Sequence, residues 1–128
     1  MAQATTLLDL GDEHFVSLTT FRKSGVGVST PVWIARDGDA LLVTTPQGSG
    51  KVKRIRNNDR VELRPSSRMG KVADDAPVAV GHAEILEETP ELENVFRKKF
   101  GLEYSFFLWI EKFSKQGTKP RYILRITQ

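Results

Sequence analysis

The residues best suited to chemistry lie in one segment, Thr44-Thr45-Pro46-Gln47-Gly48-Ser49-Gly50-Lys51-Val52-Lys53-Arg54. Its glycines allow a ligand to come close to the backbone. The first free N–H groups of the helix predicted to follow favour an anion, as does the helix dipole. Lys51 and Lys53 would supply counter-charge. The segment therefore predicts a phosphate site; a plain hairpin-to-helix connection with a solvated basic helix is the alternative.

Standard nucleotide-binding motifs do not describe this segment. A Walker A loop needs glycine where the chain has Thr45 and a hydroxyl residue where it has Val52. The dinucleotide fingerprint fails because Lys53 stands at its third glycine position. Any phosphate site here is thus of another type.

Catalytic constellations are sparse, so we assign no catalytic residue and no metal ligand. His14 and His82 lie in predicted strands without metal-ligand spacing, and the absence of cysteine excludes thiolate chemistry. If the protein is an enzyme, its difficult chemistry belongs to a cofactor that the protein holds.

Length and composition indicate a single domain over residues 1–128. Hydrophobic residues make up 39% and charged residues 27%, with a net charge of +3. Eight of the 19 basic residues fall within residues 46–72, which suggests an anionic partner or a solvated basic face. That segment contains no aromatic residue for base stacking, which disfavours nucleic acid. No apolar run is long enough for a membrane helix, and we expect a cytoplasmic protein.

Several elements must position the phosphate segment. β-Branched and aromatic residues predict strands over residues 14–22, 27–35 and 40–45, and short turns make these an antiparallel meander. Pro31 predicts an edge or a bulge in the second strand. The spacing of Val52 and Ile55 predicts a short helix over residues 49–58.

The second half of the chain adds three strands and two helices. Strands are predicted over residues 60–64, 78–87 and 122–127, with a bulge suggested at Gly81. Thr89-Pro90-Glu91 predicts the start of a helix that ends near Gly101, and another helix is predicted over residues 104–115. Strands dominate without β-α-β alternation. The fold class is therefore mainly β, a small six-stranded antiparallel barrel with helices at its ends.

The order of these pieces resembles a known family. The run SLTTFRKSGVGVSTPVWIARDGDALLVTTPQGSGKVKRIRNNDRVEL is similar to the FMN- and F420-binding split-barrel proteins related to pyridoxamine 5′-phosphate oxidase, most of all to the class of F420-dependent proteins. The resemblance covers residues 14–66, and the remaining chain agrees by layout. It implies a split barrel that forms a homodimer, with the cofactor in a groove between the subunits.

The resemblance also implies cofactor-binding residues. The segment after the third strand would hold the cofactor phosphate through Ser49, Gly50 and Lys51, with Lys53 assigned less securely. Other positions would line the groove or run along the ring system: Ser29, Thr30, Pro31, Val32, Trp33, Thr44 and Thr45. For Trp33, pocket wall and core packing both stay open.

One departure from the family bears on the cofactor. The oxidases proper carry an arginine and a lysine facing the cofactor about where this chain has Ser29 and Ile34. The departure argues against pyridoxamine phosphate oxidation and against FMN bound in the oxidase manner. Coenzyme F420, a deazaflavin with a phosphate and an anionic oligoglutamate tail, suits the surplus charge of Lys53, Arg54, Arg56 and Arg60.

The sequence therefore leaves four candidate functions. The resemblance favours an oxidoreductase that transfers a hydride between F420 and a small-molecule substrate. The alternatives are an FMN-binding oxidoreductase of the same superfamily, a non-enzymatic flavin or deazaflavin carrier, and a nucleic-acid-binding module. The lack of catalytic residues keeps the carrier open.

Overall fold

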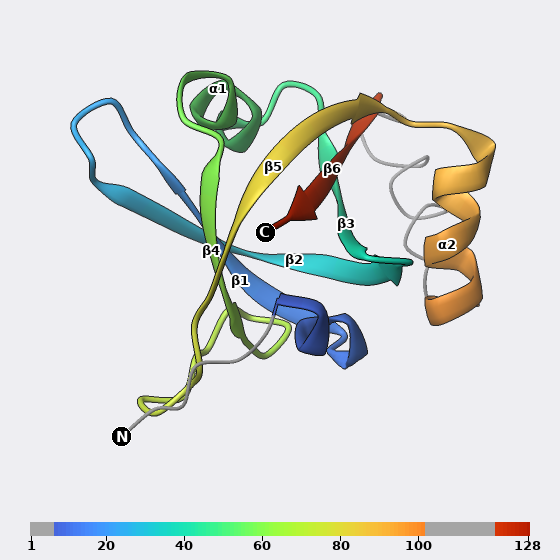
Figure 1. The fold of residues 1–128 in the computed structure, drawn as a ribbon, viewed down its shortest axis with the longest axis horizontal. Helices are drawn as coiled ribbons and strands as arrows, with labels where there is room; N and C mark the ends of the chain where they lie inside the picture. The colour runs from blue at the N-terminus through green and yellow to red at the C-terminus, as the bar shows by residue number, and fades with distance from the viewer. Residues whose placement is uncertain (1–6, 102–119) are drawn as a thin grey trace.

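A closed six-stranded antiparallel barrel forms the molecule in the computed structural model, which describes residues 7–101 and 120–128 (Figure 1). The elements are η1 (Leu7–Asp12), β1 (Phe15–Phe21), β2 (Gly27–Asp37), β3 (Ala40–Pro46), α1 (Gly50–Asn57), β4 (Arg60–Pro65), β5 (Ala79–Glu87), α2 (Pro90–Phe100) and β6 (Arg121–Thr127). Around the barrel the order is β1-β2-β3-β6-β5-β4, and β4 pairs with β1. The predicted fold class and all six strands are confirmed.

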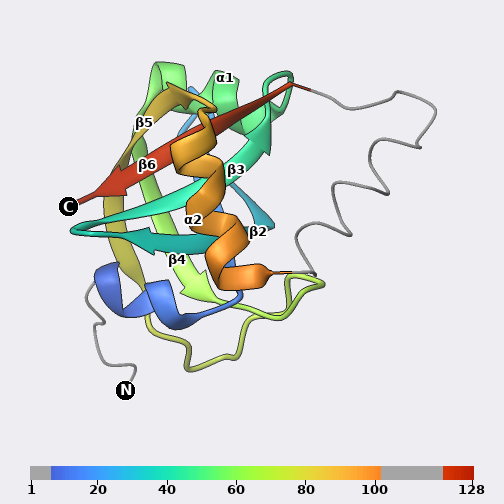
Figure 2. The same cartoon turned by 90° about the vertical axis from the view of Figure 1, so that its right-hand side faces the viewer.

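Side chains alternate along the strands and build two hydrophobic clusters. Val16 and Leu18 of β1 point into the barrel, where they join residues from all the other strands and from η1. The second cluster lies outside the barrel, where Phe96 and Phe100 of α2 cover Leu42 and Ile123. Figure 2 shows α2 lying across the outer surface of the strands. The outer cluster explains why β3 is buried on both faces.

Strand β2 pairs with β1 over its first part and with β3 over its last part. Its first seven residues pair with β1, from Phe21↔Gly27 to Phe15↔Trp33. Pairing with β3 begins at Ile34↔Val43 and ends at Asp37↔Ala40. Residues 27–33 therefore form an edge toward β3, and Pro31, which lacks an N–H, lies within this edge. The predicted edge at Pro31 is confirmed, and the barrel is split between β2 and the end of β3.

Helices close the two ends of the barrel (Figures 1 and 2). The α1 helix lies at one end and buries Val52 and Ile55 as predicted, while η1 lies at the other end. Thr89 caps α2 by accepting a hydrogen bond from the Leu92 N–H at 3.3 Å. The helix predicted over 104–115 lies outside the described residues. Within the described part of the chain, no helix is long and apolar enough to cross a membrane.

The bulge expected at Gly81 is absent. Gly81 pairs in regular register with Val61 of β4. A Cβ at this position would lie 2.8 Å from the backbone oxygen of Thr127 and 2.9 Å from Cγ2 of Ile126. The glycine is thus required by the close approach of β6.

Candidate functional site

Three cationic side chains gather at the N-terminal part of α1. Lys51 is half-buried, and its pKa is lowered by burial and then by the charges of Arg54 and Arg121. Neither Lys51 nor Arg54 forms an ion pair within the described part of the chain. Like charges that repel one another and are partly removed from water make a nearby anion favourable. We call Lys51, Arg54 and Arg121 the cation cluster.

Hydroxyl groups on the neighbouring strands orient two of these cations. Arg54 Nε donates to Thr20 Oγ1 at 2.6 Å, and Arg121 Nε donates to Thr44 Oγ1 at 2.8 Å. A Cβ on Gly50 would lie 2.8 Å from Arg54 Nη1, so the guanidinium lies over the first residue of the helix. Each guanidinium group is thereby held at its Nε atom by a threonine hydroxyl.

The start of α1 differs from the start of α2. Ser49 is the N-cap residue of α1, but its side chain makes no capping hydrogen bond. Its hydroxyl instead lies 3.1 Å from Thr45 Oγ1. The side-chain oxygen of a capping residue normally satisfies one of the free N–H groups of the first turn, as Thr89 does in α2. Without it, the first amides of α1 stay available to an anion.

The structure thus brings together the predicted residues Thr44, Thr45, Ser49, Gly50 and Lys51. Lys53, by contrast, is exposed on α1. These positions come from the end of β3 and the first turn of α1, as the sequence predicted.

Predicted residues on β2 divide between its two faces. Ser29, Pro31 and Trp33 point outward, whereas Thr30 and Val32 share the face of the inner core. Trp33 packs edge-on against Phe15 and Phe100, with ring centroids 5.4 and 4.5 Å away, so core packing accounts for at least part of its surface. Ser29 Oγ lies 2.6 Å from Thr19 Oγ1.

One hydroxyl on this strand lacks a partner. Thr30 Oγ1 is buried and forms no hydrogen bond to any described residue. Leaving a buried hydroxyl without a partner is unfavourable by about 1–3 kcal/mol. Thr30 lies in the part of β2 that has no β3 neighbour.

Sequence reasoning missed two contributors to the site, Arg121 and Thr20, and recognised Arg54 only as surplus charge. Arg121 stands 77 positions from Thr44 along the chain, and nothing in its surroundings marks it as part of a site. The pairing of β3 with β6, which sets Arg121 opposite Pro46, brings it there. The alternation of β1 could have suggested Thr20, because it places Thr20 on the face that continues toward α1.

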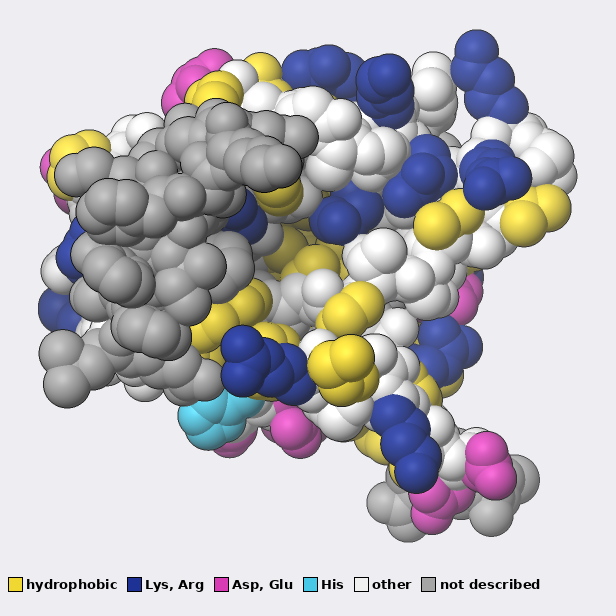
Figure 3. All heavy atoms as spheres, turned by 180° about the vertical axis from the view of Figure 1, so that it is seen from behind, with side chains coloured by type: hydrophobic (Ala, Val, Ile, Leu, Met, Phe, Trp, Pro, Cys, Tyr) yellow, Lys and Arg dark blue, Asp and Glu magenta, His cyan; other side chains and the backbone are white. Residues whose placement is uncertain are grey.

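Basic side chains border a hollow on one face of the molecule (Figure 3). Figure 3 shows Lys and Arg side chains along the upper part of one face, next to a hollow with hydrophobic side chains in its floor. A depression of about 440 Å³ adjoins the phosphate segment and is lined by Pro46, Gln47, Gly48, Ser49 and Pro120. Gln47 N–H donates to the Pro120 carbonyl at 3.0 Å, which ties the segment to the start of β6.

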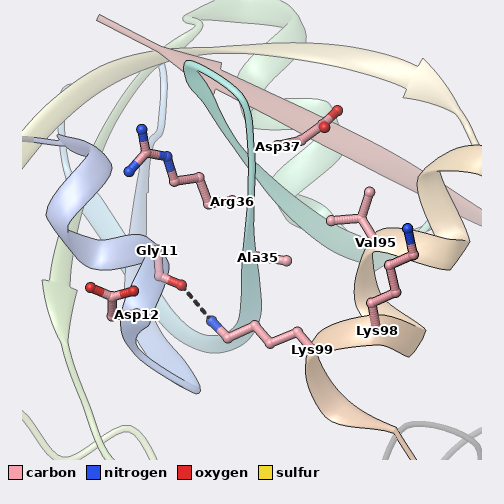
Figure 4. A pocket seen from close by; sticks show the side chains of 8 residues that line it. All are labelled: Gly11, Asp12, Ala35, Arg36, Asp37, Val95, Lys98 and Lys99. Carbon is pink, nitrogen blue, oxygen red and sulfur yellow. Dashed lines mark hydrogen bonds between the residues drawn. The ribbon is translucent and has the colours of Figure 1, made fainter.

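A different cavity, of about 530 Å³, lies between η1, β2 and α2 (Figure 4). Its most buried charged group is Lys99, whose Nζ donates to the carbonyls of Gly11 at 2.7 Å, Ile34 at 2.7 Å and Glu13. Burial lowers the pKa of Lys99, and the nearby carboxylates of Asp12 and Glu13 partly oppose that shift. All three ammonium protons are engaged, so this lysine is a structural tie and is unavailable to a ligand.

Metal and acid–base sites are not apparent in residues 7–101 and 120–128. No group of three or more His, Cys, Asp or Glu side chains is arranged to hold a metal among them. His82 Nδ1 lies 2.8 Å from Asp59 Oδ1, but both side chains are more than half exposed. His14 packs edge-on against Phe100. The site is therefore suited to an anion, and the described residues provide no evident proton donor.

Comparisons with known proteins bear on the family and the fold. A sequence model described as pyridoxamine 5′-phosphate oxidase matches residues 3–127. No curated protein matches the chain in a sequence search. Among solved structures, a pyridoxamine 5′-phosphate oxidase-like protein from Listeria innocua has a TM-score of 0.63 at 15% identity, over 94% of this chain and 88% of its own.

Two further structures carry cofactor names. A protein named F420 reductase has a TM-score of 0.59 at 20% identity, over 94% of this chain and 90% of its own. A FAD-binding protein from Mesorhizobium loti has a TM-score of 0.61 at 16% identity, over 92% of this chain and 81% of its own. At these identities the likeness concerns the fold.

Proposed function

The chain belongs to the pyridoxamine 5′-phosphate oxidase family of flavin-binding split-barrel proteins, and from this premise we propose that it binds coenzyme F420 and transfers a hydride between that cofactor and a small molecule. The cation cluster is the single observation that carries this proposal. Lys51 and Arg54, which form no ion pair among the described residues, lie near Arg121 at an uncapped helix start, where a phosphodiester would balance the charge of Lys51 and Arg54.

The surroundings of the cluster favour a cofactor that continues beyond its phosphate. The phosphate of FMN is terminal, whereas F420 carries a lactyl oligoglutamate tail beyond its phosphate. The depression lined by Pro46 to Ser49 and Pro120 gives room for such an extension beside the cluster. Lys53 and Arg56 are exposed on α1 and would attract carboxylates of the tail.

At the other end of the groove, the chain would orient the ring system. When bound, reduced F420 would supply a hydride, which carries two electrons and one proton, to an electron-poor acceptor. The β2 segment over residues 29–33 would line the ring, and Thr30 Oγ1 offers it an unmatched hydroxyl. Hydride transfer depends mainly on proximity and orientation. A second proton for the acceptor would come from solvent, so the absence of an acid–base pair in the described residues is no obstacle.

A second copy of the chain would complete the groove. Residues 27–33 of β2 have no strand partner toward β3 and leave one side of the split open. We propose a homodimer that covers this edge. The alternatives are an FMN-dependent oxidoreductase and a cofactor carrier without turnover.

Fluorescence titration of the purified protein with F420, FMN and inorganic phosphate tests the proposal. We expect tight binding of F420, weaker binding of FMN, and competition by phosphate. A preference for FMN would place the protein among the FMN-dependent members. Binding of F420 without oxidation of its reduced form by any of a panel of electron-poor acceptors would favour the carrier.

A matched pair of variants separates the site from general electrostatics. Lys51→Met removes a cation of the cluster, whereas Lys98→Met removes an exposed cation from α2 with the same change in net charge. Only Lys51→Met should weaken F420 binding. Equal losses in both variants would show that net charge alone attracts the cofactor and would contradict the proposed site.

A further inference from the structure

The connection between β4 and β5 contains a built turn that the proposed function does not use. Gly70 N–H donates to the Ser67 carbonyl at 3.0 Å, and Ser67 N–H donates to the Lys71 carbonyl at 2.9 Å. Ser67 Oγ also accepts from the Lys71 N–H at 3.0 Å, and Gly70 has a φ of +87°. Three hydrogen bonds and a glycine in the left-handed region fix the conformation of this turn.

The turn rests on the open edge of β2. An added Cβ on Gly70 would lie 3.3 to 3.7 Å from three ring carbons of Pro31, so the turn is in contact with this proline. Pro31 points outward between Ser29 and Trp33, in the segment of β2 that β3 does not cover. The turn therefore stands beside the split.

The turn and the cation cluster lie a short distance apart along β2. Val28 pairs with Thr20, whose hydroxyl receives the hydrogen bond from Arg54. Pro31 lies three residues farther along β2, roughly 10 Å at the usual rise of a strand. Thr20, which holds Arg54, and Pro31, which the turn contacts, thus lie at two levels along β1 and β2, Thr20 on the inner face and Pro31 on the outer face. In Figure 3 hydrophobic side chains lie on the side of the hollow away from most of the Lys and Arg side chains.

Met69 occupies the tip of this turn and is 88% exposed. The other large hydrophobic side chains that are exposed in the described part of the chain are Val26, at 56%, and Val80, at 45%. An apolar, polarisable side chain held in water on a fixed turn is suited to contact an aromatic ring.

We propose that Met69 is a specificity-determining residue that forms the ring-side wall of the cofactor groove. The proposal rests on the proposed function and extends it to the acceptor. With the cofactor phosphate at the cation cluster, the ring system reaches toward Pro31, where Met69 contacts the ring or the acceptor stacked on it. Arg68 and Lys71 flank Met69 and are exposed. The wall therefore selects a flat, conjugated acceptor with an apolar body and no positive charge.

Oxidation of the methionine side chain tests this position without any turnover. The protein is treated with dilute hydrogen peroxide, with and without saturating F420, and sulfoxide formation at Met69 is followed by mass spectrometry. Oxidation of a free methionine-containing peptide in the same tube reports the effective concentration of the oxidant. Because oxidation follows exposure, bound cofactor should slow it at Met69 by about tenfold.

A control variant places the probe elsewhere. The double variant Met69→Leu with Val80→Met carries the probe methionine on β5, and two strands lie between β5 and β2 in either direction around the barrel. Its oxidation should not respond to F420. A titration on the same samples shows whether the cofactor binds.

The outcomes separate the two proposals. If F420 binds and the oxidation rate of Met69 does not change, Met69 does not line the cofactor groove, while the proposed function is unaffected. Slow oxidation of Met69 already in the cofactor-free protein, whether or not F420 binds, would mean that another surface covers it, which also overturns the wall. If F420 does not bind, both proposals fall.

Kinetics supply a second readout. Met69→Ser should raise KM for an apolar conjugated acceptor severalfold while KM for reduced F420 changes little, and Val80→Ser should change neither. An unchanged acceptor KM in Met69→Ser would contradict the assignment of acceptor specificity to this residue.

Discussion

Lys51 and Lys99 are both partly buried lysines with a lowered pKa, yet their surroundings differ. Lys99 donates to three backbone carbonyls and has Asp12 and Glu13 nearby, which offset part of the effect of burial. Lys51 has two arginines nearby, and the structure shows no hydrogen bond from its ammonium group to a described residue. The fold supplies hydrogen-bond partners for the ammonium group of Lys99 but not for that of Lys51.

The comparison shows that a shifted pKa does not by itself identify a functional lysine. What distinguishes the two is whether the fold supplies partners for the ammonium protons. The cavity beside Lys99 is somewhat larger than the depression beside the phosphate segment, at about 530 Å³ against about 440 Å³, but its lysine has no proton left to donate. Cavity size is therefore a weaker guide than unsatisfied charge.

The strongest test of this contrast is Lys99→Met. The variant leaves the carbonyls of Gly11, Glu13 and Ile34 without their donor, and we expect it to lower the free energy of unfolding by about 3 kcal/mol. Urea denaturation of this variant and of Lys98→Met measures the effect. If Lys99→Met lowered the free energy of unfolding by less than Lys98→Met does, the hydrogen bonds of Lys99 would contribute little to stability.

Lys51→Met should have the reverse pattern. The cofactor-free protein should keep or slightly gain stability, because a repelled and partly buried charge is removed. Affinity for F420 should fall roughly 30-fold, equivalent to about 2 kcal/mol for a charge-assisted hydrogen bond. Thermal melts with and without cofactor measure both quantities. A marked loss of stability without cofactor would mean that Lys51, like Lys99, stabilises the fold, which would contradict the contrast between the two lysines.

Glycine substitutions compare the packing of the two regions. A Cβ at Gly11 would lie 2.8 Å from Arg36 Cβ, whereas a Cβ at Gly48 meets nothing within 4 Å. Gly11→Ala should therefore destabilise the protein by about 2 kcal/mol through overpacking. Gly48→Ala should change the stability little, and the denaturation midpoints of the two variants measure the difference. Equal effects would show that the phosphate segment is as tightly packed as η1.

The smallest expected effect is on pH dependence. Because the pKa of Lys51 is lowered, its ammonium loses its proton below the usual range near 10.5. Affinity for an anionic cofactor should decrease as pH rises through that pKa, and binding should take up protons. Stability without cofactor should change in the opposite direction, since the unfolded chain binds the proton more strongly there. Titrations at several pH values test this, and the part due to Lys51 should vanish in Lys51→Met.

The sequence sufficed for the local features of the fold. Strand alternation, the short turn between β2 and β3 and the capping threonine of α2 depend on neighbouring residues, and the structure agrees with each. Gly81 misled because a glycine inside a strand signals either a bulge or a close approach. Only the position of β6 shows which one applies.

The candidate site could be predicted only in its contiguous part. Thr44 to Lys51 form a single run, so their proximity follows from the chain itself. Arg121 enters through a strand pairing that sequence separation conceals, and Thr20 through contact with α1. Which of the β2 residues face outward required the register with β1.

The pairing of β3 with β6 also has a consequence for how the site comes into being. Thr44 meets Arg121 across 77 positions, and contacts of such long range form slowly because a large loop must close first. The hairpins β1-β2 and β2-β3 are able to form early, but the cation cluster is incomplete until β6 docks. A partly folded or nascent chain therefore lacks the full binding site. Cofactor capture would draw refolding molecules toward the closed barrel, so an excess of F420 during refolding should raise the yield of native protein.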